Sequence, residues 1–445
     1  MGDDDQKLST GRFARLAKLA SLSARLSTEV VSRGVKRFGG GEPDASLLGA
    51  GAAEKLVATL GDLKGLAMKL GQQVSMDPDL LSPEVRAVVA RLQNQAPPMP
   101  WAAARAVLEA ELGRPPEEAF ARFEQAPMAA ASLGQVHRAW THAGEAVAVK
   151  VQYPDIARAL EADLDNVGSL VAVVSRTARL AHGRGYYQEL RAALLQELDY
   201  REEAGRALAY LAAAAPLGDV TVPRPVLELT TRRVLTLQLL QGRTYKDALQ
   251  HPDRLDPAER FRASRLLIRA VWGPFLLTGT IHADPHPGNF MLLDDGTVGV
   301  LDFGAVKPLS EAWTRVNRRL LVEATEGRPM DALARCLEAG FRFDDLAVAR
   351  PFVDRIVDVA TRPLRSRDFD YTTAFVNRDM RNHFIAHAVQ LKGMKPPTES
   401  VQFFRAIGGL SQNLENLGAR GDFRGVYREL AALLPPQAEP SVAGP

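Results

Sequence analysis

The feature that most constrains this chain is a polar loop followed by a hairpin pattern, between His282 and Gly304. The loop carries Asp284 and, five residues later, Asn289; the sequence Asp-Phe-Gly begins thirteen residues further on, at Asp302. In between, an Asp-Asp-Gly turn separates two apolar runs, which predicts a β-hairpin. Because a hairpin brings its two ends together, we expect Asn289 and Asp302 to lie close in space.

The oxygen-bearing side chains of this stretch suit magnesium. Mg²⁺ prefers hard oxygen ligands and keeps several waters, so one or two carboxylates, an amide oxygen and phosphate groups complete its shell. We assign Asn289 and Asp302 as magnesium ligands. The spacing from Asp284 to Asn289 is also that of the protein-kinase catalytic loop. The alternative, a turn rich in Asp, Pro and Gly, explains Pro285 and Pro287 but not the Asp-Phe-Gly at this distance.

A second kinase-like string is Val-Ala-Val-Lys, which ends at Lys150. In a strand Val147 and Val149 share one face, while Ala148 and Lys150 share the other. Small alanines beside a lysine leave room for a flat ligand next to an ammonium group. The string resembles the strand of protein kinases whose lysine contacts the α- and β-phosphates of ATP. An exposed strand lysine is the alternative for this string taken alone.

A helix expected from about Gln188 to Ala215 supplies acidic candidates for holding the strand lysine. In kinases this carboxylate comes from a helix that crosses behind the strand, and we assign Glu197 to the role. Residues two apart on a helix point about 200° apart, so Asp199 would serve a different group. We expect Glu202 and Glu203 on a solvated acidic face.

The glycine-rich hairpin that covers the phosphates in kinases is absent before Lys150. In its place stands an alanine-rich loop: Ala129, Ala130, Ala131 and Ser132, followed by Leu133 and Gly134. Alanine adopts positive φ less cheaply than glycine, so we expect a stiffer loop over the nucleotide, with Ser132 as a phosphate contact. A helix end before a strand is the alternative.

Five strings together carry a family resemblance: AAASLGQVH, VAVKVQYP, QELDY, HADPHPGN and LDFG. They resemble the UbiB/AarF family of atypical protein-kinase-like proteins, which support ubiquinone and other prenyl-quinone lipid metabolism. The segment from Lys69 to Gln72 matches the KxGQ motif of that family, and Glu197 to Asp199 matches its ExD motif. The resemblance implies an α+β, two-lobed protein-kinase-like fold with a helical N-terminal extension that carries the KxGQ motif.

The resemblance also implies where this extension lies. It would cross the site at which a protein kinase accepts its peptide, so that Lys69 and Gln72 point at the nucleotide cleft, with Asp199 as their partner. Such an arrangement argues against phosphorylation of proteins in trans. Backbone groups of Gln238 and Leu239 would meet the adenine ring. Gln238 stands where relatives often have an acidic residue, and backbone recognition makes that difference minor.

The implied activity is that of an atypical kinase or ATPase with ATP and Mg²⁺ as cofactors and a prenyl-quinone precursor or other lipid as a partner. Lys150 would hold the α- and β-phosphates, Glu197 would position Lys150, and Asp284 would act as base or orient water. Two alternatives stay open. One is a small-molecule or protein phosphotransferase, and the other is a non-catalytic nucleotide-sensing scaffold of a lipid-pathway complex.

Composition narrows location and partners. The chain has 55 basic and 53 acidic residues, a net charge of +2, so overall charge does not call for nucleic acid. The single cysteine, Cys336, favours a reducing compartment, and neither a signal peptide nor a transmembrane run is expected. We therefore expect a cytoplasmic protein. A basic amphipathic helix near the N-terminus would allow peripheral membrane contact through anionic lipids, with a plain solvated helix as an equal alternative.

The chain is expected to contain five consecutive segments. They are a basic amphipathic helix and flexible linker (1–45), a helical KxGQ extension (46–126), a kinase-like N-lobe with the alanine-rich loop (127–241), a helical C-lobe with the catalytic and metal loops (242–434), and a disordered tail (435–445).

Overall fold

The computed structural model describes most of the chain beyond residue 97. The described residues are 98–131, 133–158, 160–161, 164, 191, 195, 197–387 and 393–435. Three predicted site residues, Lys69, Gln72 and Ser132, lie outside them, as do the predicted basic N-terminal helix and residues 436–445 of the predicted tail. The predicted segment boundaries at 45, 126, 241 and 434 stay predictions.

The chain divides into two compact units. The first contains the residues up to Glu202 together with Val226–Leu237, and the second contains Glu203–Pro225 and everything from Gln238 onward. The chain therefore passes from one unit to the other three times, and the last passage lies between Leu237 and Gln238, inside the connection that was expected to meet the adenine ring.

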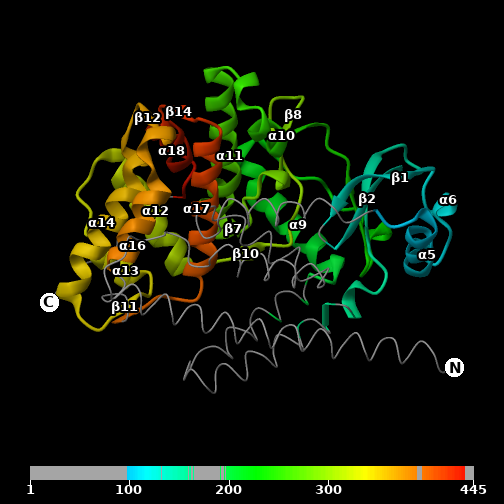
Figure 1. The fold of residues 1–445 in the computed structure, drawn as a ribbon, viewed down its shortest axis with the longest axis horizontal. Coiled ribbons are helices and arrows are strands. Elements are labelled where there is room, and N and C mark those ends of the chain that lie inside the picture. Colours follow the sequence, from blue (N-terminus) through cyan, green and yellow to red (C-terminus); the bar gives the residue numbers. More distant parts are fainter. Residues whose placement is uncertain are drawn as a thin grey trace, which may run out of the picture. The chain divides into compact units, whose positions relative to one another are not determined.

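A four-stranded sheet with the order β1-β2-β3-β5 organises the first unit (Figure 1). Its elements are α5 (Trp101–Leu112), α6 (Pro116–Ala119), β1 (Arg122–Ala131), β2 (Gly134–Trp140), β3 (Ala146–Gln152) and β5 (Val234–Gln238). On β3 the alternate residues Val147, Val149 and Val151 are fully buried, and α5 packs on this strand. Since β-strand side chains alternate between faces, the face opposite these valines carries Ala148 and Lys150, as predicted.

The alanine-rich segment is the end of a strand rather than a free loop. Ala129, Ala130 and Ala131 lie in β1, and Ala131 pairs with Gly134 across the hairpin to β2. A Cβ atom added at Gly134 would stand 2.0 Å from the main-chain oxygen of Val151, so only glycine allows β2 to approach β3 this closely. Strands β2 and β3 form a second antiparallel hairpin, and β1 begins at Arg122, inside the stretch that was predicted to be helical.

The predicted helix from Gln188 to Ala215 is interrupted. Glu197 and Leu198 form a turn, Asp199 has no regular structure, and α9 runs over Tyr200–Ala214. Asp199 Oδ1 accepts a hydrogen bond from the backbone N–H of Arg201 at 3.0 Å, a capping contact that favours the start of a helix. The argument that placed Glu197 and Asp199 on opposite sides of one helix was therefore wrong, because neither residue is helical.

A second four-stranded sheet, ordered β4-β9-β8-β6, lies in the second unit. Its strands are β4 (Val220–Thr221), β6 (Gly242–Thr244), β8 (Phe290–Leu293) and β9 (Val298–Val300). Three two-stranded pairs accompany it: β7 (Thr280–His282) with β10 (Val306–Pro308), β11 (Arg342–Phe343) with β13 (Met394–Lys395), and β12 (Phe369–Asp370) with β14 (Arg420–Gly421). The pair β7–β10 frames the predicted catalytic loop.

Helices make up most of the second unit. They are α10 (Tyr245–Gln250), α11 (Pro257–Thr278), α12 (Glu311–Glu326), α13 (Ala332–Glu338), α14 (Leu346–Arg365), α15 (Tyr371–Ala374), α16 (Val376–Ala386), α17 (Ser400–Asn416) and α18 (Phe423–Ala431). The central α11 starts at a reciprocal cap between Asp256 and Glu259 and ends at Gly279, whose φ is +79°. Among the described residues, no helix is both long enough and apolar enough to cross a membrane.

Candidate active site

The predicted hairpin brings Asn289 and Asp302 to the same end of one β-ladder. Phe290 on β8 pairs with Val300 on β9, and the N–H of Leu301 donates to the main-chain oxygen of Asn289 at 2.9 Å. At the other end the turn contains Gly296, whose φ of +85° suits glycine. The proximity that the sequence predicted for Asn289 and Asp302 therefore follows from the pairing of these two strands.

His282 anchors the start of this loop from inside the protein. Its side chain is fully buried, Nε2 lies 2.6 Å from the main-chain oxygen of Asp302, and Nδ1 lies 3.3 Å from the backbone N–H of Asp284. These contacts require Nε2 to donate and Nδ1 to accept, which is the pattern of neutral imidazole. Burial lowers the pKa of His282, and this favours the same neutral form. His282 thus ties the Asp284 loop to the Asp302 turn.

The side chains of Asp284 and Asn289 contact each other. Asn289 Nδ2 donates to Asp284 Oδ2 at 3.2 Å and to the main-chain oxygen of Asp284 at 3.1 Å. Because Nδ2 makes these two hydrogen bonds, the acceptor atom of the same amide group, Oδ1, remains to bind a cation. Asp284 Oδ1 is buried and has no hydrogen-bond partner among the described residues, although Arg405 Nη2 lies 3.4 Å away.

The Asp-Phe-Gly turn is held from two sides. Asp302 Oδ1 accepts a hydrogen bond from the N–H of Gly304 at 2.9 Å, and Arg206 on α9 donates to the oxygen of Gly304 at 3.2 Å. Phe303 is fully buried, and its ring lies 6.0 Å from that of Tyr210, which also contacts His282 edge-on. The aromatic contacts hold the backbone, and the Asp302 carboxylate is left half-buried.

Two residues of α17 support the loop and were missed in the sequence. Arg405 forms the ion pair with Asp284 described above, and Asn413 Nδ2 donates to the main-chain oxygen of Pro285 at 2.5 Å. Arg405 and Asp284 are 121 residues apart in the chain. No local pattern around Arg405 could have indicated this contact, because it depends on how α17 packs in the folded unit.

In the first unit, Lys150 is half-buried on β3, and its Nζ lies 4.9 Å from the ring centre of Tyr200. A cation over an aromatic face is favourable. Ala148, on the same face of β3, is half-buried as well.

Gln152 follows Lys150 on the same face of β3. Its side chain is buried, and its Nε2 donates to the main-chain oxygen of Leu198 at 2.9 Å. Gln152 therefore fixes the Glu197–Asp199 turn against β3, a positioning role that the sequence did not suggest.

The two acidic residues of the ExD string have different surroundings. Glu197 is half-buried in the turn before α9. Asp199 forms a two-pronged ion pair with Arg201, with distances of 2.6 and 3.0 Å. The hydrogen bond from Arg201 lowers the pKa of Asp199. Its predicted partners Lys69 and Gln72 lie outside the described residues, so that pairing stays a prediction.

The sequence-based prediction of exposure was wrong for one carboxylate on α9. Glu203 is only 5% exposed, whereas its neighbour Glu202 is exposed as expected. The prediction of a solvated face for Glu203 was wrong: successive residues of a helix point about 100° apart, so α9 exposes Glu202 and buries Glu203. Carboxylates are rarely buried to this degree unless they are paired.

The predicted adenine-binding positions lie where β5 ends. Gln238 is the last residue of β5 and is exposed, and its N–H donates to the main-chain oxygen of Arg224 at 2.9 Å. Leu239 follows it and is half-buried. Because this N–H is already used, the main-chain groups of Leu239 fit the predicted adenine contact better than the N–H of Gln238.

The oxygen donors of the loop suit a magnesium ion that is bound partly by phosphate groups. They suit less well a metal ion whose ligands all come from the protein. In the part of the chain that the structure describes, no three His, Cys, Asp or Glu residues are grouped to hold a metal ion. The available donors are carboxylate oxygens of Asp302 and Asp284 and the amide oxygen of Asn289. Mg²⁺ commonly binds through one or two carboxylates, waters and substrate phosphates. Asp284 Oδ1 lies 3.4 Å from Arg405 Nη2 but accepts no hydrogen bond from the described residues, which is consistent with a group that an additional ligand approaches.

Comparison with known proteins relates this chain to atypical kinases. A family profile described as the ABC1 atypical kinase-like domain matches residues 91–331. The uncharacterized protein sll0005 of Synechocystis is 33% identical over 312 residues, which cover 67% of this chain and 44% of that protein. The mitochondrial atypical kinase COQ8B of Rattus norvegicus is 28% identical, with 91% of this chain and 78% of that protein covered.

A solved structure is similar over most of the chain. The complex of Rv3197 with erythromycin from Mycobacterium tuberculosis is 30% identical, with a TM-score of 0.63, and the match covers 85% of this chain and 95% of that one. Together with the family profile, this likeness shows a kinase-like fold of mixed helices and sheets.

Proposed function

Since this chain belongs to the ABC1 atypical kinase-like family, also called UbiB, we propose that it binds ATP with Mg²⁺ and hydrolyses it in support of prenyl-quinone lipid metabolism. The observation that carries the proposal is the oxygen set of Asp284, Asn289 and Asp302 on one loop and hairpin. Relatives named as COQ8 atypical kinases support the link to ubiquinone biosynthesis.

The proposed roles follow from the chemistry of each residue. Asn289 and Asp302 hold Mg²⁺, which neutralises charge on the phosphates when bound. Lys150 provides a positive charge to the α- and β-phosphates. Asp284, oriented by Asn289 and Arg405, accepts a hydrogen bond from the attacking water or hydroxyl. The backbone beside Gln238 and Leu239 receives the adenine, and Ala129–Ala131 lie over the phosphates.

The carboxylate that positions Lys150 has two candidates. Glu197 is the one that the sequence indicated, and Glu203 is the deeply buried residue on α9. We propose Glu203, because a buried carboxylate on a helix is better fixed than one in a half-buried turn. Glu197 and Asp199 then serve as the contacts for Lys69 and Gln72 of the KxGQ segment.

The proposal is tested by ATP hydrolysis in the purified full chain with Mg²⁺, measured as release of free phosphate. We expect Asp302→Asn to lower turnover by about 100-fold or more, since one metal-binding charge is lost at the phosphates. Asp295→Asn is the matched control, because Asp295 is exposed on the turn of the same hairpin and is expected to leave turnover unchanged. Undiminished turnover in Asp302→Asn contradicts the proposal.

The two alternatives give different outcomes in the same preparation. Labelled phosphate that appears on an added phenol, lipid or protein, rather than as free phosphate, favours a phosphotransferase. Thermal stabilisation by Mg-ATP with no turnover, with or without lipid vesicles, favours a nucleotide-sensing scaffold. We also propose a cytoplasmic location with peripheral membrane contact, which co-sedimentation of the full chain with anionic vesicles tests.

A further inference from the structure

A large apolar cavity lies among the helices of the second unit, and no residue of the Asp284 loop lines it. It has a volume of about 540 Å³ and is bounded by residues of α11 to α18. Cavities that hold drug-sized ligands span roughly 300–1,000 Å³ and are mostly apolar. A space of this size in a helical core is unusual, because protein interiors are packed as densely as organic crystals.

The lining is aromatic and aliphatic. The lining includes six aromatic side chains from five helices and β11: Trp272, Trp313, Phe343, Phe352, Phe384 and Phe403. On α16, Val376, Met380 and Phe384 repeat every four residues and so share one face. All three line the cavity, and no residue of α16 is fully buried. The apolar face of this helix is therefore incompletely covered by protein atoms.

Two indole groups in the lining have no acceptor. Trp272 and Trp313 are 8% and 2% exposed, and the Nε1–H of each has no hydrogen-bond partner among the described residues. Two other polar lining groups are satisfied locally: Asn317 donates to the oxygen of Trp313 at 2.9 Å, and Thr361 donates to the oxygen of Val357 at 2.7 Å. Because buried donors are nearly always paired, the two indoles are the lining groups that a bound acceptor would satisfy.

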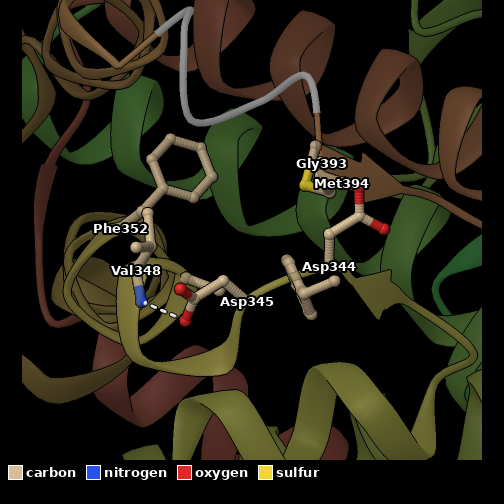
Figure 2. A pocket seen from close by; sticks show the side chains of 8 residues that line it. Asp344, Asp345, Val348, Phe352, Gly393 and Met394 are labelled. Atoms are coloured by element: carbon tan, nitrogen blue, oxygen red, sulfur yellow. Dashed lines mark hydrogen bonds between the residues drawn. The ribbon is translucent and has the colours of Figure 1, made fainter.

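A smaller pocket of about 80 Å³ adjoins this cavity (Figure 2). Phe343, Phe352 and Met394 line both spaces, while Asp344 and Asp345 are exposed at the rim of the small one. Figure 2 shows Asp345 turned back onto its own helix, where it accepts a hydrogen bond from the N–H of Val348. The shared side chains form a common wall of the two spaces.

We propose that the cavity is a binding site for a neutral, chain-like apolar molecule, of prenyl or alkyl kind, that carries an oxygen acceptor for the Nε1–H of Trp272 or Trp313. A hydrocarbon chain fits the apolar lining, and one carbonyl or phenolic oxygen satisfies an indole donor. The inference rests on the cavity and not on the proposed ATP chemistry, so its test uses binding without nucleotide.

Gly408 offers a way to block the cavity without a clash. It lines the cavity on α17, and a Cβ atom placed there meets no heavy atom within 4 Å. Gly205 on α9 is the matched control, because a Cβ atom there also meets nothing within 4 Å and the residue is exposed. Leucine at either position replaces glycine by a better helix former, so loss of fold is not expected. The melting temperatures of both variants check this.

The experiment measures fluorescence of N-phenyl-1-naphthylamine with the purified full chain, then its displacement by 2-tridecanone or by tridecane. We expect Gly408→Leu to weaken dye binding about tenfold or more and Gly205→Leu to leave it unchanged. In the unaltered chain the ketone should displace the dye at about tenfold lower concentration than the hydrocarbon, because it accepts a hydrogen bond. In the double variant Trp272→Phe/Trp313→Phe that preference should disappear while dye binding remains.

Two results overturn the inference. One is absence of dye binding to the unaltered chain, which is also the outcome if other residues of this chain fill the cavity. The other is dye binding by Gly408→Leu equal to that by Gly205→Leu. Equal displacement by ketone and hydrocarbon in the unaltered chain contradicts the role of the two indoles. None of these results depends on whether the chain hydrolyses ATP, so failure here is separate from failure of the proposed function.

Discussion

Two carboxylates near the start of α9 illustrate what individual residues contribute. Glu197 belongs to a string that is recognisable in the sequence, yet it lies half-buried in a turn. Glu203 belongs to no string quoted from the sequence, yet only 5% of it is exposed. A charge leaves water at a high free-energy cost unless another group pairs with it. Burial of this degree is therefore the reason to propose a role for Glu203 that no sequence string indicated.

We expect Glu203→Gln to lower kcat/KM for ATP more than Glu197→Gln, by about tenfold, since a neutral amide no longer positions the lysine ammonium. Glu202→Gln is the control, because its exposed carboxylate is expected to contribute little. Steady-state kinetics at several ATP concentrations measure the three variants, and melting temperatures confirm that each folds. A loss for Glu203→Gln no larger than for Glu202→Gln would assign the role to Glu197.

His137 predicts a pH dependence of stability. Its imidazole is fully buried, contacts the main-chain oxygen of Glu124 at 2.9 Å, and has a pKa lowered from 6.5 because burial disfavours the charged form. Below about pH 6.5 the unfolded chain binds a proton that the folded chain does not. Stability is therefore complete above that pH and falls as the pH drops.

The test of this dependence is thermal unfolding from about pH 7.5 to about pH 5.5. We expect His137→Asn to be less stable at the upper pH, because it fills less space, but to lose less stability on acidification than the unaltered chain. Parallel curves for the two proteins would show that His137 does not contribute to the acid sensitivity.

At the scale of elements, the first sheet depends on one close approach between strands. Gly134 opens β2, and a side chain there would meet the main-chain oxygen of Val151 on β3. The same strand carries Gln135, which is buried and accepts a hydrogen bond from the N–H of Met99 at 2.8 Å. The motif Leu-Gly-Gln-Val-His thus joins the hairpin to β3 and to the chain before α5, and part of it is structural rather than catalytic.

We expect Gly134→Ala to destabilise the chain by about 1–3 kcal/mol or more, as overpacking against a backbone does. Gly205→Ala is the matched comparison: nothing lies within 4 Å of its added Cβ, and alanine in an exposed helix interior should stabilise by up to ~1 kcal/mol. Urea unfolding measures both free energies. Equal stabilities for the two variants would mean that β2 can move away from β3 at little cost.

At the scale of the whole molecule, the chain crosses between two compact units three times. Lys150 belongs to the first unit and Asp302 to the second, and both are among the residues proposed to bind the nucleotide. A ligand that binds the folded form of such a protein stabilises it in proportion to its concentration relative to Kd. Nucleotide binding should therefore appear as a property of the complete fold.

We expect Mg-ATP at about 100 times its Kd to stabilise the chain by ~2.7 kcal/mol. The stabilisation should be lost when a chelator removes the magnesium and should be reduced in Asp302→Asn. Thermal unfolding with ATP, with ATP plus chelator, and without nucleotide measures these differences. Identical unfolding in all three conditions would contradict nucleotide binding independently of any turnover assay.

Some features were predictable because they depend on residues close together in the chain. The hairpin around Gly296, the alternation of buried valines on β3, and the helix Trp101–Leu112 follow from turn chemistry, strand periodicity and a preceding proline. The family resemblance rested on strings of the same local kind, and it is confirmed. The roles proposed for the individual site residues remain predictions.

What the sequence by itself determined was therefore the local apparatus: the loop with Asp284 and Asn289, the Asp302 turn, the lysine strand and the family. Only the tertiary structure decided that α17 holds this loop through Arg405, that Glu203 is buried, and that a cavity lies among the helices. The physical reason is distance along the chain. Local backbone preferences act over a few residues, whereas these contacts join segments that meet only when apolar surfaces pack together.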